Sequence, residues 1–242
     1  MKAIYHIADL NIEISSVYQY VHLLCSDYRG YGFPSLVVHV TQKDLERERK
    51  LSAMEDDRIG RERKEYPDHY LEAIAAYRQI AEQLPEFDGF VFHGSAIAFE
   101  NKGYVFTAKS GTGKSTHTEL WRKLLGKKVC IINDDKPIIC FRHEQPFVYG
   151  TPWSGKERLN RNIAVPLDAI CILDQAETNS IREITKSEAL PMLIQQTYRP
   201  SDPLVMERTL NLLDQLDIRF YHLGCNMDIS AAELSYKVMV QA

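Results

Sequence analysis

The sequence predicts an α/β fold in which a mixed β-sheet is flanked by helices, preceded by a smaller α+β region. Two observations support this fold class. From Phe87 onward, short apolar runs alternate with segments of helical periodicity, as in a layered α/β core. Before Pro85, the chain instead carries strand patterns, a highly charged segment and one amphipathic helix. We therefore expect an N-terminal accessory region at residues 1–86 and a larger domain at residues 87–242.

The N-terminal region is predicted from three kinds of pattern. Residues 10–14 alternate between apolar and polar side chains, as in a half-buried strand, and residues 36–40 form a second predicted strand. Residues 43–65 hold 16 charges, eight of each sign, which favours a solvated helix or a mobile segment over a partner-binding surface. The apolar stripe over residues 70–84 predicts an amphipathic helix that ends at Pro85.

The larger domain is predicted as strands separated by helices. The expected strands are residues 90–92, 104–106, 129–132, 169–173 and 218–223, and the expected helices lie near residues 115–125, 186–198, 202–216 and 230–240. The run 129–132 is apolar throughout, as expected of a strand that is buried on both faces.

Composition excludes several classes of protein. The content of 45% hydrophobic and 26% charged residues argues against a disordered chain. The 29 Lys and Arg residues against 33 Asp and Glu residues give a net charge of −4, so we expect neither nucleic acid nor a membrane surface as a partner. The five cysteines are far apart and form no CxxC motif, and the first 15 residues lack the apolar core of a signal peptide. We therefore expect a cytoplasmic location.

The clearest motif lies in residues 103–118. A short apolar strand leads into Ser110-Gly111-Thr112-Gly113-Lys114-Ser115, and a helical pattern follows. This is the strand–loop–helix context of a P-loop, whose glycines let main-chain N–H groups approach phosphate oxygens. In such a loop Lys114 reaches the β- and γ-phosphates, and Ser115 offers its hydroxyl to Mg²⁺. We predict ATP and Mg²⁺ as ligands, bound by Ser110, Gly111, Thr112, Gly113, Lys114, Ser115 and, at the α-phosphate, Thr116.

One position departs from the usual P-loop pattern. Ala108 stands where that pattern begins with glycine. The role of this first glycine is mainly conformational, so we expect alanine to be tolerated if its φ stays negative.

Two adjacent carboxylates, Asp134 and Asp135, follow the buried strand 129–132. A carboxylate at the end of a strand beside a P-loop is where nucleotide-hydrolysing enzymes hold Mg²⁺. Neighbouring residues of a strand face opposite ways, so we predict two different roles for the pair. One carboxylate binds the metal, and the other accepts a proton from an attacking hydroxyl.

With His93-Gly94 upstream, the P-loop and the Asp134-Asp135 pair give residues 88–140 a resemblance to bacterial HPr kinase/phosphorylase. That family is related in fold to phosphoenolpyruvate carboxykinase, so the resemblance implies a P-loop core of the carboxykinase-like type. It also implies that Asp134 is the base with His93 as its tuning partner, that Asp135 and Ser115 bind Mg²⁺, and that Lys114 binds the phosphates. Residues 141–242 match loosely and residues 1–85 hardly at all, which indicates the broader group of HPr-kinase-like proteins.

Residues 149–162 form a glycine-punctuated segment that is rich in Lys and Arg. Phosphoryl transfer develops negative charge on the γ-phosphoryl oxygens, and a cation from outside the P-loop commonly stabilises that charge. We name Lys156 and Arg158 as candidates for this cation. The alternative is a surface loop whose charges are solvated.

Together these features predict a Mg²⁺-dependent, ATP-binding kinase that transfers the γ-phosphoryl group to a serine-type hydroxyl on a protein, a peptide or a small molecule. The main alternative is a non-catalytic, nucleotide-binding regulatory protein. A decarboxylating carboxykinase is disfavoured because the chain is short and carries no second cluster for that substrate and its metal. Phosphorylase or phosphatase activity at the same site stays open, and a homo-oligomer is expected only from its frequency among soluble proteins.

Overall fold

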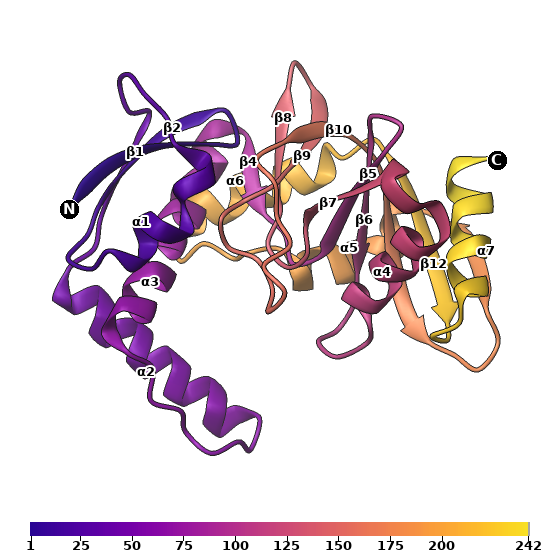
Figure 1. The fold of residues 1–242 in the computed structure, drawn as a ribbon, viewed down its shortest axis with the longest axis horizontal. Coiled ribbons are helices and arrows are strands. Elements are labelled where there is room, and N and C mark those ends of the chain that lie inside the picture. Colours follow the sequence, from indigo (N-terminus) through magenta and orange to yellow (C-terminus); the bar gives the residue numbers. More distant parts are fainter. Residues whose placement is uncertain (242) are drawn as a thin grey trace. The chain divides into compact units, whose positions relative to one another are not determined.

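The computed structural model describes residues 1–241, which divide into two compact units (Figure 1). The first unit is Met1–Gln83, and the second begins at Leu84. Each unit has its own sheet and its own helices. No helix among the described residues is both long and apolar enough to span a membrane.

The first unit combines a three-stranded sheet with helices. Its elements are β1 (Lys2–Ile7), β2 (Leu10–Ser15), α1 (Tyr20–Leu24), β3 (Leu36–His39), α2 (Gln42–Arg58) and α3 (Asp68–Gln83). Strands β1 and β2 are antiparallel, and β3 adds parallel to β2. The charged segment forms α2 and leaves the helix after Arg58. Within α2, the buried Glu48 forms an ion pair with Arg78 of α3. The predicted solvated helix is therefore present but shorter than the charge run.

The second unit is built on a nine-stranded mixed sheet. Its strands are β4 (Gly89–Val91), β5 (Ser95–Phe99), β6 (Lys102–Thr107), β7 (Val129–Asn133), β8 (Ile138–Arg142), β9 (Gln145–Tyr149), β10 (Ala164–Gln175), β11 (Ser180–Ile184) and β12 (Arg219–Cys225). The order is β4-β8-β9-β10-β6-β5-β7, and β12 pairs with both β10 and β11. The predicted α/β class with a mixed, helix-flanked sheet is therefore confirmed.

Strand direction brings four carboxyl ends to one edge of the sheet. Strand β10 is parallel to both β6 and β12. Strand β5 is antiparallel to both β6 and β7, so β7 runs in the same direction as β6. The segments that follow β6, β7, β10 and β12 therefore all leave the sheet at the carboxyl-terminal end of these strands. Ligands commonly bind at this end of open α/β sheets.

Helices cover both faces of this sheet. One core combines the side chains of α4 (Lys114–Leu125) and α7 (Ile229–Val240) with strand residues such as Ile97 and Phe106, and Figure 1 shows these two helices side by side. The other core combines α5 (Lys186–Gln196) and α6 (Pro203–Asp214) with residues such as Phe90 and Ile132. All five residues of β5 are buried, because the strand lies between the two cores.

A buried polar network joins α4 to α7. His117 and Trp121 of α4 both hydrogen-bond to the Ser235 hydroxyl of α7, at 3.1 Å from His117 Nε2 and 2.9 Å from Trp121 Nε1. His117 is 2% exposed, and burial lowers its pKa from 6.5 to about 4. Its Nδ1 is the one buried side-chain nitrogen or oxygen in the described chain that has no hydrogen-bond partner.

The pKa of His117 predicts an acid-dependent loss of stability. The unfolded chain binds this proton near pH 6.5 and the folded chain only near pH 4, so the free energy of unfolding falls as pH falls through that window. The loss attributable to His117 is at most roughly 3 kcal/mol. Urea unfolding followed by tryptophan fluorescence reports the second unit, which holds Trp121 and Trp153. We expect His117→Gln to flatten the pH dependence between 6.5 and 4, and equal slopes in the two proteins would contradict this assignment.

Candidate functional site

A glycine loop, here residues 108–113, connects β6 to α4. Gly111 has φ +82 and Gly113 has φ +116, values that L side chains rarely adopt, and nothing lies within 4 Å of a Cβ built at either position. Glycine is therefore required by the backbone at both positions and not by crowding. Helix α4 begins immediately after Gly113, so its unpaired N–H groups and the positive end of its dipole lie next to the loop.

Ala108 lies at the start of the loop and belongs to the core. Its side chain is fully buried among the residues that pack under α4, and its φ is not positive. The backbone at this position therefore does not require glycine, as expected for an alanine that begins the loop. The methyl group also contributes packing that a glycine would lack.

Lys114 is held inside the loop. It is 9% exposed, and its Nζ donates a hydrogen bond to the main-chain oxygen of Ala108 at 3.3 Å. Burial lowers the pKa of Lys114, and the negative charge of Asp135 opposes that change. The ammonium group is thus partly desolvated, close to a carboxylate and at the base of a glycine loop. Such an ammonium is suited to an anionic ligand.

Ser110, Ser115 and Thr116 are exposed around the same helix end. The Ser115 hydroxyl makes no hydrogen bond to the described residues, so it is open to a ligand. Thr112 lies within the loop, where its N–H donates to Lys109 O at 3.3 Å.

Asp134 is buried at the end of β7. It is 5% exposed, and its Oδ1 accepts a hydrogen bond from the Gly155 N–H at 2.6 Å. Burial raises the pKa of this carboxyl, although the hydrogen bond from Gly155 acts in the opposite direction. A Cβ at position 155 would lie 2.8 Å from Asp134 Oδ2, so only glycine fits against the carboxylate. Asp134 thus anchors the loop that contains Gly155.

Asp135 is the partner of His93. His93 Nε2 lies 3.3 Å from Asp135 Oδ1, and Lys136 Nζ lies 2.8 Å from Asp135 Oδ2. Burial alone would raise the pKa of Asp135, but the hydrogen bond from His93 and the charge of Lys136 hold it well below its usual range. The structure thus pairs His93 with Asp135, whereas the family resemblance implied a pairing with Asp134. The Asp134 carboxylate turns to Gly155 and leaves Asp135 on the side of His93 and Lys114.

Asn133 fixes the turn that carries both carboxylates, a role that the sequence analysis missed. Its Nδ2 donates to the main-chain oxygens of Thr151 and Trp153, both at 3.1 Å. Its Oδ1 accepts from the N–H groups of Asp135 at 2.9 Å and Lys136 at 2.6 Å. The residue is fully buried. An amide that follows an apolar strand and precedes two aspartates was the available signal.

Lys156 and Arg158 are exposed, and neither forms an ion pair within the described chain. Arg158 lines a cavity that contains no residue of the glycine loop. The role of a cation from this segment on the phosphoryl group stays a prediction.

A cavity of about 490 Å³ adjoins the glycine loop. One side is Gly111–Gly113 with Thr116, His117 and Leu120 of α4, and the other is formed by the segments after β10 and β12. Gln175 Nε2 bridges the two sides through a 3.4 Å hydrogen bond to Thr112 O. The volume suits a small organic ligand, and the lining is mainly apolar. The sequence analysis missed this cavity because its two sides are more than 50 residues apart.

The residues beside the glycine loop fit a Mg²⁺ ion that is held partly by substrate and water, and they do not form a site in which protein side chains supply all the ligands. Among residues 1–241 no group of three or more His, Cys, Asp or Glu side chains gathers as a metal site. Mg²⁺ is commonly held by one or two protein oxygens together with substrate phosphates and water. The open Ser115 hydroxyl and the Asp135 carboxylate, whose low pKa favours its ionised form, are donors of this kind.

Comparison with known proteins gives a likeness in structure and none in sequence. No family model matches the sequence, and no curated protein matches it. The solved structure of the HPr(Ser) kinase/phosphatase from Coxiella burnetii aligns with 63% of this chain and 99% of that chain, at 9% identity and a TM-score of 0.36. At this level of similarity no family membership and no residue role passes from that enzyme to this chain.

Ala108 provides a test of the glycine loop. We expect Ala108→Gly to lower the free energy of unfolding by about 0.5–1 kcal/mol, because it removes a buried methyl group and adds backbone freedom. Affinity for ATP should change less than about twofold, because the backbone conformation already suits alanine. Urea unfolding and isothermal titration calorimetry measure the two quantities. A clear gain in ATP affinity would show that Ala108 distorts the loop.

Proposed function

We propose that this chain is a Mg²⁺-dependent phosphotransferase that moves the γ-phosphoryl group of ATP to a serine-type hydroxyl on a protein, a peptide or a small molecule. The single observation that carries the proposal is the juxtaposition of Lys114, in its glycine loop, with Asp135 and His93 at the neighbouring strand end. Lys114 and its glycine loop suit a polyphosphate, and His93 with Asp135 suits acceptance of a proton beside it.

The phosphate-binding half of the proposal rests on main-chain geometry. The glycine loop and the first turn of α4 present N–H groups around Lys114 without side chains in the way. Ser115 and Asp135 are the proposed Mg²⁺ ligands. A bound Mg²⁺ supplies positive charge that neutralises the phosphate oxygens. The adjoining 490 Å³ cavity, which His117 and Leu120 of α4 help to line, is the proposed position of the nucleoside.

The proton-accepting half rests on His93. Its side chain is 35% exposed, and its Nε2 donates a hydrogen bond to the Asp135 carboxylate, which leaves Nδ1 for the hydroxyl of the acceptor substrate. Asp134 is the alternative base. Its raised pKa suits proton acceptance, but the carboxylate is covered by Gly155. We therefore propose that His93 receives the proton, Asp135 orients His93, and Asp134 positions the loop.

Binding of ATP tests the phosphate site directly. We expect Lys114→Ala to weaken ATP binding by roughly tenfold or more, because it removes a buried positive charge facing the phosphates. Lys109→Ala is the matched control, since Lys109 is exposed in the same loop and donates no side-chain hydrogen bond in the described chain. Calorimetry with ATP and Mg²⁺ measures both variants. Equal affinities of Lys114→Ala and the wild type would refute the phosphate site.

Transfer of labelled phosphate separates the two candidate bases. With γ-labelled ATP, Mg²⁺ and fractionated cytosolic extract as the source of acceptor, we expect His93→Gln to slow transfer by about 10²–10⁴-fold. Asp134→Asn should keep transfer within about tenfold of the wild type, because an amide oxygen still accepts the Gly155 hydrogen bond.

The opposite ranking of the two variants would identify Asp134 as the base. If the wild type binds ATP yet transfers no label to any fraction or to water, the non-catalytic regulatory alternative replaces the kinase proposal.

A further inference from the structure

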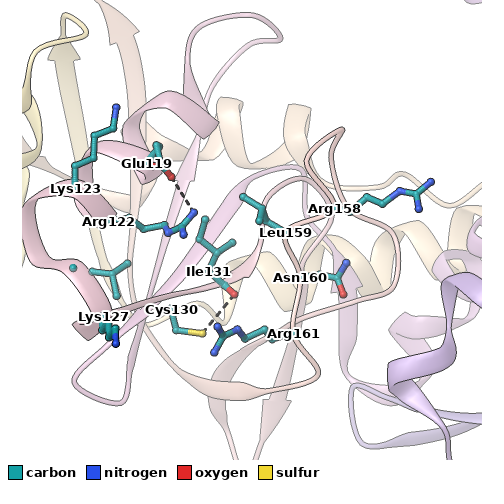
Figure 2. Close-up of a pocket in the computed structure, with 12 residues that line it drawn as sticks. Glu119, Arg122, Lys123, Lys127, Cys130, Ile131, Arg158, Leu159, Asn160 and Arg161 are labelled. Atoms are coloured by element: carbon teal, nitrogen blue, oxygen red, sulfur yellow. Dashed lines mark hydrogen bonds and ion pairs between the residues drawn. The ribbon is translucent and has the colours of Figure 1, made fainter.

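A second cavity, of about 710 Å³, lies in the second unit away from the glycine loop (Figure 2). Its walls are the outer side of α4, the short helix η3 (Gly126–Lys128) and the loop 158–161, and its floor is the beginning of β7. None of its lining residues belongs to the glycine loop or to the Asp134-Asp135 pair. We call it the β7 groove.

The β7 groove is strongly basic. Five of its 12 lining residues are cations, namely Arg122, Lys123, Lys127, Arg158 and Arg161, and its one carboxylate, Glu119, is bound to Arg122 at 3.0 Å. The other four cations form no ion pair within residues 1–241. The whole chain carries a net charge of −4, so this concentration of positive charge is a local feature. It favours an anionic ligand.

The floor of the groove is an open strand edge. Strand β7 is the last strand of its sheet and pairs with the neighbouring strand β5, while its other side is bridged to Asn160 at Asn133. Its second half is covered by the loop, because Arg161 N–H donates to Ile132 O at 2.9 Å and Asp134 N–H donates to Leu159 O at 3.1 Å. Residues 129–131 have no second neighbouring strand within the described chain. Alternate residues of an edge strand direct main-chain groups away from their partner, so this half can accept another strand.

We propose that the β7 groove binds an extended, acidic peptide segment of a partner protein, which pairs with residues 129–131 of β7. Added strands gain affinity from main-chain hydrogen bonds and specificity from alternate side chains. Here acidic side chains of the segment would contact Lys127 and Arg161. This site does not depend on the proposed phosphotransferase activity.

The distribution of the cations favours a peptide over a small anion. Figure 2 shows the side chains of Lys123, Lys127 and Arg161 at different parts of the rim, with Arg158 directed away from them. A single phosphate is bound where donors converge, whereas these cations are spread along β7. The loop 159–161 already uses main-chain pairing on the other half of the same edge. The open half therefore offers a partner the same mode of binding.

Fluorescence anisotropy with synthetic peptides tests the proposal. The probe is a fluorescein-labelled octapeptide of alternating Glu and Val, compared with a Lys and Val octapeptide and with a Glu and Pro octapeptide that cannot form a strand ladder. We expect binding of the Glu and Val peptide, which weakens with salt, and at least roughly tenfold weaker binding of the other two.

The protein variants locate the site. We expect Lys127→Glu with Arg161→Glu to weaken binding of the Glu and Val peptide by roughly tenfold or more. The control, Arg208→Glu with Lys237→Glu, makes the same change in net charge at exposed positions outside the groove. Circular dichroism checks that both variants are folded, and single Lys127→Gln and Arg161→Gln variants provide a milder version of the same test.

Three outcomes would overturn the proposal. They are no binding of the Glu and Val peptide, equal loss in the groove variant and the control, and equal binding of the Glu and Pro peptide. The last outcome, together with full competition by inorganic triphosphate, would identify a small-anion site instead. Lys114→Ala should leave peptide binding unchanged, so failure of the phosphate site and failure of the groove are observed separately.

Discussion

The hydrogen bonds of Asn133 hold together the part of the molecule on which the candidate site depends. One amide group binds two main-chain oxygens of the 151–153 segment and two main-chain N–H groups of the turn that follows β7. Because the side chain is fully buried, removing its amide would leave buried main-chain groups of this turn, such as the N–H groups of Asp135 and Lys136, without the partner they have here. These bonds stabilise the conformation in which Asp134 faces the 155 loop and Asp135 faces His93 and Lys114.

Burial and neighbouring charge give similar groups different properties within this site. The pKa of Asp134 is raised by burial, whereas that of Asp135 is lowered by His93 and Lys136 despite its burial. Lys114 is also desolvated, and in the described chain its charge is balanced by Asp135 and by the main-chain oxygen of Ala108. A phosphate bound in the glycine loop would add further acceptor oxygens and negative charge around this desolvated ammonium group.

The sequence patterns predicted those parts of the fold that depend on residues close together in the chain. The strand–loop–helix at Ser110–Ser115 and the carboxylates after β7 were found because each lies within a few residues of its structural context. Four of the missed strands, β1, β5, β8 and β9, belong to hairpins whose two-residue turns lack glycine. In each turn both residues have positive φ, among them Glu100, Asn101, His143 and Glu144, so the usual Asn-Gly signal was absent. The partner of His93 depends on which way Asp134 turns, and that is set by Gly155 and Asn133 through tertiary contacts.

One short segment links the candidate site to the β7 groove. Gly155 covers the Asp134 carboxylate, and a few residues later Leu159 and Arg161 bind the main chain of β7 on both sides of Asn133. The same segment thus closes the carboxylate and forms one wall of the groove. Leu159 accepts a hydrogen bond from the Asp134 N–H, and the Arg161 N–H donates to the Ile132 oxygen two residues before Asp134. Main-chain pairing of this short loop with β7 is therefore a structural element that the groove and the carboxylate turn share.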